Sequence, residues 1–139
     1  MSDEESRRLT DHVLLRELAR QALGVRVARV ERLRGGTKKG VYRLVPATGF
    51  AVIAYVWSER ENFWPVCGQG TREDLFAHAD GVELFVAARD RLEHGGVRVP
   101  AVHVVKRDHP GLGADVALVE DVPGPTLEEY LAWGDTARV

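Results

Sequence analysis

A glycine-rich turn carries residue types that can bind an anion. Residues 35–40 read Gly-Gly-Thr-Lys-Lys-Gly and lie between two short strand-like stretches. Glycines let the backbone bend tightly and bring N–H groups close to a ligand, which suits phosphate oxygens. The segment lacks the Gly-Lys-Ser/Thr ending and the following helix of a P-loop, and unlike a dinucleotide fingerprint it opens a strand. An ordinary turn and a phosphate clamp both remain open at this point.

The residues around the turn are strongly basic. Seven arginines and lysines but a single acid, Glu31, lie between positions 26 and 43, although the whole chain has a formal net charge of −2. A basic patch raises the local concentration of anions. The alternative is that these arginines cover the solvent face of edge strands. We do not expect nucleic-acid binding, which favours a larger basic excess with interleaved aromatic residues, whereas here only Tyr42 is interleaved.

The sequence contains no motif for metal binding or for thiol chemistry. The five histidines do not have metal-ligand spacing, and Cys67 is the single cysteine. We therefore expect no metal site and no disulfide bond, and a cytoplasmic location fits such cysteine usage. Glu83 is a candidate partner for a buried cation, with an exposed helix carboxylate as the alternative.

Hydrophobic periodicity predicts the elements that position these groups. The expected elements are a helix over 10–23, strands over 25–33, 41–45 and 50–57, a helix over 71–94, strands over 101–105 and 117–119, and a helix from Thr126. Gly24 is a natural left-handed stop for the first helix. Gly81 weakens the middle of the long helix by about 1 kcal/mol, so that two shorter helices are an alternative. Residues 58–70 are expected to be an irregular insertion, and residues 107–114 a loop.

The fold class that follows is α+β, a five-stranded, mostly antiparallel sheet with a long covering helix. With 139 residues, 45% of them hydrophobic, the chain is the size of one domain or one lobe and can bury a core. Its first residues do not form the apolar segment of a signal peptide. The longest apolar run, residues 50–57, is too short to span a bilayer, and no membrane partner is expected.

Three segments together resemble the N-terminal lobe of the aminoglycoside phosphotransferase and choline kinase family, which shares the protein-kinase-like fold. They are residues 33–44 (LRGGTKKGVYRL), 92–102 (LEHGGVRVPAV) and 117–127 (ALVEDVPGPTL). Their order and spacing match the family's glycine loop, the entry to its fourth strand, and its hinge. The resemblance implies a flexible N-terminus over 1–9, a kinase-like lobe and hinge over 10–125, and the start of a truncated C-terminal lobe over 126–139.

The resemblance also implies an activity, the ATP-dependent transfer of a phosphoryl group to a hydroxyl of a small molecule. Gly35, Gly36 and Thr37 would then lie over the nucleotide phosphates. The backbone around Glu120, Asp121 and Val122 would bind the adenine edge. Val52 or a neighbour would floor the adenine pocket, and Glu83 would lie near the helix glutamate that pairs with the strand lysine.

This sequence departs from the family pattern at its third strand. Residues 50–57 read FAVIAYVW, which places Ala54 or Tyr55 where the family carries a phosphate-binding lysine. The nearest cations that could take over this role are Lys38 and Lys39. Losing the strand lysine would remove part of the electrostatic stabilisation on which phosphoryl transfer depends.

The family's catalytic Asp–Asn loop and metal-binding Asp also find no counterpart in these 139 residues. We therefore expect this chain alone to be inactive, with Mg²⁺ involved only if a C-terminal lobe is supplied. A non-catalytic nucleotide- or partner-binding module is the alternative, and an unrelated domain with an ordinary glycine turn is a third interpretation. The expected partners are a nucleotide and either a missing C-terminal lobe or a second copy. These would cover an apolar hinge face around Val122, Leu127, Tyr130 and Leu131.

Overall fold

The computed structural model of the chain describes residues 10–34, 39–61 and 81–136. In chain order the described elements are α1 (His12–Leu23), β1 (Val27–Arg32), β2 (Gly40–Pro46), β3 (Val52–Trp57), the 3₁₀ turn η1 (Glu59–Glu61), α2 (Val82–His94), β4 (Val102–His109), β5 (Ala114–Glu120) and α3 (Leu127–Thr136). The predicted α+β fold class, with five antiparallel strands, is confirmed.

The five strands form one sheet in the order β1-β2-β3-β5-β4, with every neighbouring pair antiparallel. β3 lies at the centre, where Ala54 is opposite Tyr42 on one side and Leu118 on the other. The apolar run of β3 is explained by this central place, because both faces of the strand are covered.

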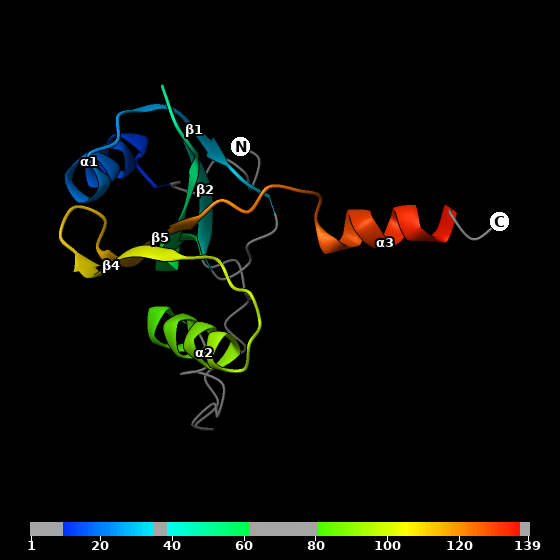
Figure 1. The fold of residues 1–139 in the computed structure, drawn as a ribbon. Helices are drawn as coiled ribbons and strands as arrows, with labels where there is room; N and C mark the ends of the chain where they lie inside the picture. The colour runs from blue at the N-terminus through cyan, green and yellow to red at the C-terminus, as the bar shows by residue number, and fades with distance from the viewer. Residues whose placement is uncertain (1–9, 35–38, 62–80, 137–139) are drawn as a thin grey trace, which may run out of the picture.

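Two helices cover opposite faces of the sheet (Figure 1). α1 packs Leu15 and Leu18 onto the face that buries Tyr42 and Leu44. α2 covers part of the other face, where Phe85 packs against a smaller cluster of Ile53, Ala117 and Val119. Alternation along β2 therefore sends odd-numbered side chains toward the α2 face and even-numbered ones toward the α1 face.

Sequence signals for helix ends agree with the structure at both ends of the chain. Asp11 caps α1 by accepting a hydrogen bond from the Val13 N–H at 2.8 Å, and Gly24 follows the helix in the left-handed conformation. Thr126 and Glu129 form a reciprocal capping box at the start of α3.

Two sequence predictions need correction. β4 continues to His109 and β5 begins at Ala114, so half of the expected 107–114 loop is strand, joined by a turn over 110–113. Hydrophobic periodicity does not predict this pairing, because the polar side chains at the end of β4 face water while their backbones pair with β5. The long helix begins at Val82 directly after Gly81, whose φ of 108° is outside the helical range. Its expected first turns at 71–80 lie outside the described residues.

Candidate functional site

The predicted phosphate-binding turn lies between the ends of β1 and β2. Its residues Gly35, Gly36, Thr37 and Lys38 lie outside the described residues, and Lys39 and Gly40 are within them. The turn-side ends of β1, β2 and β3 lie next to one another, as the pairs Arg32↔Tyr42 and Gly40↔Val56 show. Two groups of side chains meet there, one on each face of the sheet.

On the α2 face, the Lys39 ammonium lies against three aromatic rings. Its Nζ is 4.2 Å from the ring centroid of Tyr55, 5.5 Å from that of Trp57 and 5.8 Å from that of Phe85. The rings also contact one another edge-on or tilted, with centroids 5.3–6.0 Å apart. Each ring face attracts a cation by about 0.5–2 kcal/mol, depending on how dry the contact is.

Lys39 is a partly buried cation that has no acidic neighbour among the described residues. Within the described part of the chain, no carboxylate approaches Lys39 Nζ within ion-pair distance. Burial lowers the pKa of the Lys39 ammonium and raises the pKa of the Tyr55 hydroxyl, because both charged forms lose hydration. An anionic ligand would supply the counter-charge that the described residues do not provide.

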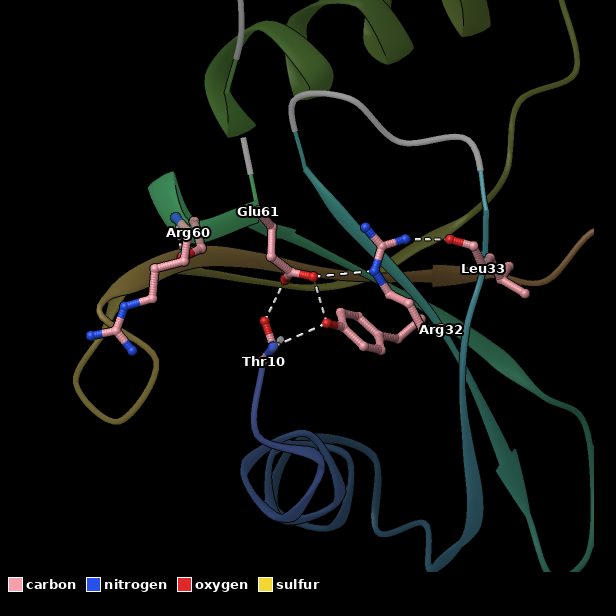
Figure 2. A network of polar contacts seen from close by, with 7 residues as sticks. Thr10, Arg32, Leu33, Arg60 and Glu61 are labelled. Atoms are coloured by element: carbon pink, nitrogen blue, oxygen red, sulfur yellow. Dashed lines mark hydrogen bonds and ion pairs between the residues drawn. The ribbon is translucent and has the colours of Figure 1, made fainter. Parts of the chain in front are cut away.

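On the α1 face, a buried carboxylate joins several separate parts of the chain (Figure 2). Glu61 is fully buried. It accepts hydrogen bonds from Thr10 Oγ1 at 2.5 Å, from Tyr42 Oη at 2.5 Å and from Arg32 Nε at 3.2 Å. Arg60, beside Glu61 in the chain, points away from this network (Figure 2). The network thus connects η1, the end of β1 and the start of β2 to Thr10, the residue before the cap of α1.

The other members of this network are themselves well satisfied. The Tyr42 hydroxyl also accepts the Thr10 backbone N–H at 3.1 Å. Burial, and then donation to Glu61, raise the pKa of Tyr42, which keeps the hydroxyl neutral as a donor. Arg32 donates in addition to the Leu33 carbonyl and lies 5.4 Å from the centroid of the Tyr42 ring. Glu61 is not among the residues predicted for the site, because position 61 falls in the expected irregular insertion.

Gly40 is the point where the two groups meet. An added Cβ on Gly40 would lie 2.1 Å from Glu61 Oε2 and 2.5 Å from its Cδ, well inside van der Waals contact. Only a glycine therefore fits beside the Glu61 carboxylate. The preceding residue, Lys39, carries its side chain to the opposite face.

At the end of β5, the carboxylates of the residues expected to form the hinge accept hydrogen bonds from other parts of the chain. The Asp121 carboxylate accepts a hydrogen bond from Arg43 Nε at 2.8 Å, and that of Glu120 accepts one from the Ala101 N–H at 3.0 Å. The backbone groups of Asp121 and Val122 make no hydrogen bond within the part of the chain that the structure describes. They are thus available to a ligand.

The described residues provide no metal site, because no group of three or more His, Cys, Asp or Glu side chains comes together in them. Nor does the described part contain a helix long and apolar enough to cross a membrane. An open hollow of about 560 Å³ lies elsewhere, between η1 and the β4–β5 turn, with Trp57, Arg60 and Asp108 among its lining residues.

Comparison with known proteins adds one structural likeness. No family model and no curated protein matches the chain. The fold is similar to that of a Ralstonia eutropha JMP134 protein assigned as an aminoglycoside phosphotransferase, with a TM-score of 0.53 over 86% of this chain at 18% identity. The matched part is the N-terminal portion of that protein. The chain has a kinase-like N-lobe fold. It spans 30% of the neighbour's length, and at this identity the likeness concerns the fold alone.

Two further predicted residues are Glu83 and Val52, and Glu83 is the exposed helix carboxylate that was given as the alternative for it. Glu83 is largely exposed at the surface and pairs with Arg107 of β4, which lowers the pKa of the Glu83 carboxyl. Glu83 and Lys39 thus do not pair with each other, because Glu83 pairs with an arginine on the surface of the sheet and Lys39 lies against the aromatic rings. Val52 belongs to the core under α1, whereas its neighbour Ile53 lies on the α2 face.

The segment that follows β5, where the hinge is expected, leads into several exposed apolar residues. Val122 is 49% exposed, Leu127 73%, Tyr130 65% and Leu131 62%, so the four apolar side chains predicted to be exposed are exposed. Figure 1 shows α3 extending away from the sheet and the two other helices.

Proposed function

We propose that the chain is the nucleotide-binding lobe of an ATP-dependent small-molecule phosphotransferase. The observation that carries this proposal is the Lys39 ammonium at the end of the glycine-rich turn, held on three rings and without a carboxylate partner among the described residues. A cation placed so that an anion completes its surroundings is what phosphate binding requires. The kinase-like N-lobe fold supports the same conclusion.

The remaining parts of the nucleotide would contact the α2 face of the sheet. The free backbone groups of Asp121 and Val122 would hydrogen-bond the adenine edge, as a hinge does in the family that the sequence resembles. Ile53, rather than Val52, lies on the face where an adenine floor is needed. The predicted contacts of Gly35, Gly36, Thr37 and Lys38 with phosphate oxygens stay part of this proposal.

In this mechanism Lys39 holds the phosphates and offsets their negative charge. The ring cluster keeps the ammonium in a partly dry position, where its attraction to an anion is stronger than in water. The described residues would supply binding and orientation only, and we derive no step through a metal ion. Mg²⁺ would enter with the nucleotide and find its ligands in a C-terminal lobe.

Binding of ATP is the first test. We expect the 139-residue chain to bind Mg²⁺·ATP saturably in isothermal titration calorimetry. Lys39→Met should weaken this binding about tenfold, which corresponds to about 1.4 kcal/mol. Affinity should also fall as the pH rises toward the lowered pKa of Lys39, because the neutral amine no longer attracts phosphate.

Lys106→Met is the matched control for this titration, since Lys106 is an exposed lysine of β4 and should leave the affinity unchanged. If both variants bound ATP with the affinity of the wild type, Lys39 would not belong to the ATP-binding site. If no nucleotide binds at all, the alternative of a partner-binding module becomes the better one. The exposed apolar residues of α3 and the hinge are the observation that favours it.

Turnover is the second test. We expect the purified chain to release no ADP from ATP in the presence of aminoglycosides, choline-like alcohols or sugars, because its sequence holds no Asp–Asn catalytic loop. Binding with the glycine turn alone does not position a nucleophile and a metal. A coupled assay for ADP measures this directly. Mg²⁺-dependent turnover that Lys39→Met reduces would contradict the proposed inactivity of the chain alone.

A further inference from the structure

The buried carboxylate of Glu61 lies where the backbone of β2 leaves the glycine-rich turn. Its three donors come from the segment before α1, from the end of β1 and from β2, at Thr10, Arg32 and Tyr42 respectively. A buried carboxylate loses its hydration and is retained only where donors replace the lost water. The residues that Glu61 fixes are therefore those on both sides of the turn.

Glu61 can also influence the opposite face of the sheet, because its carboxylate packs against the backbone of Gly40. Its Oε2 occupies the space where a Cβ of residue 40 would lie, so the carboxylate packs directly against the β2 backbone. Successive residues of a strand face opposite sides, and Lys39 directly precedes Gly40. A shift of Glu61 would therefore move the backbone from which the Lys39 side chain extends to the rings.

We infer that Glu61 is a positioning residue, whose carboxylate holds the start of β2 so that the Lys39 ammonium stays on the Tyr55, Trp57 and Phe85 rings. Its role toward ATP rests on the proposed function, whereas its effect on Lys39 exists without any ligand. Glu61 itself faces α1 and the Thr10 segment and does not contact the nucleotide. Its influence on phosphate binding passes through the backbone of Gly40 and Lys39.

The first test measures Lys39 directly. Glu61→Gln keeps the size of the side chain but removes the charge that accepts from Arg32. We expect acylation of the Lys39 amine, followed by peptide mass spectrometry, to become several-fold faster in this variant, because the amine leaves the rings more often. The reaction is run near pH 10.5, about the ordinary lysine pKa, so that a change in the Lys39 pKa alters the neutral fraction little. Lys106 in the same molecule should react at an unchanged rate. Glu59→Gln, an exposed carboxylate of the same 3₁₀ turn, is the matched control and should leave both rates unchanged.

Hydrogen exchange separates positioning from a general loss of stability. In Glu61→Gln we expect faster exchange at Leu33 and Val41, whose backbones pair beside the turn, with α2 and β5 unchanged. Exchange that accelerates equally in every element, together with an unchanged ratio of Lys39 to Lys106 labelling, would overturn the inference. Arg32→Met removes one donor instead of the carboxylate and serves where Glu61→Gln does not fold. It should raise the same labelling ratio.

The ligand arm compares ATP with adenosine, which has no phosphates. We expect Glu61→Gln to weaken ATP binding several-fold and to leave adenosine binding unchanged. Equal weakening of both ligands would contradict a role through Lys39. If the wild type binds neither ligand, the proposed function fails, and the labelling ratio alone then supports or overturns the positioning of Lys39 by Glu61.

Discussion

Glu61→Ala is expected to lower the free energy of unfolding by about 3–5 kcal/mol, the range found when one partner of a buried ion pair is removed. The variant would leave the Tyr42 hydroxyl without its acceptor and Arg32 without its carboxylate. The side chain of Arg32 is 19% exposed, so water can reach it only in part. A cavity would also form where a fully buried side chain had been.

Urea denaturation followed by circular dichroism measures this loss. Such a change is a large part of the stability of a small domain, which is about 5–15 kcal/mol in total. Glu59→Ala is the matched control, because Glu59 lies two residues earlier in the same turn and is exposed. A loss no greater than that of the control would show that the network contributes nothing to the stability of the folded chain.

Gly40→Ala is expected to destabilise the fold by about 2–4 kcal/mol, from overpacking and from broken hydrogen bonds of the network. The new Cβ would lie 2.1–2.7 Å from the carboxylate atoms of Glu61, which must then leave Thr10 and Tyr42. The cause is this contact and not backbone strain, since Gly40 is not among the glycines with positive φ.

A double-mutant cycle tests that explanation. In the Glu61→Ala background the clash is gone, so Gly40→Ala should cost little, with a coupling energy of about 1–3 kcal/mol. Gly134→Ala in α3 is the control, because nothing lies within 4 Å of an added Cβ there. It should be neutral or stabilise α3 by up to about 1 kcal/mol. Additive effects of the two changes at positions 40 and 61 would contradict the packing argument.

The fold could largely be predicted from local patterns. Alternation along a strand puts Tyr42 and Leu44 on the same face of β2, and both are buried there. Gly24 and Thr126 marked helix ends through the conformations and hydrogen bonds that these residue types favour. The lengths of β4 and β5 could not be predicted, because the pairing of polar residues such as Lys106 depends on the partner strand.

The candidate site depends on contacts between distant residues, and these have no local signal. Lys39 could be named as a cation near the turn, but the rings around it come from β3 and from α2, at Tyr55, Trp57 and Phe85. In the sequence, Glu61 follows an apolar strand and cannot be told apart from an ordinary surface glutamate. Its donors at positions 10, 32 and 42 become neighbours only when the sheet and α1 are in place.

The order of the strands has a consequence for how the chain behaves at high concentration. Among the described residues, no strand pairs with the outer edges of β1 and β4, so that another chain could extend the sheet there. Both carry exposed charged side chains there, Arg29 on β1, and Lys106 and Arg107 on β4. Desolvating these charges would penalise edge-to-edge pairing. Basic residues on both outer strands thus disfavour edge-to-edge association of the sheet.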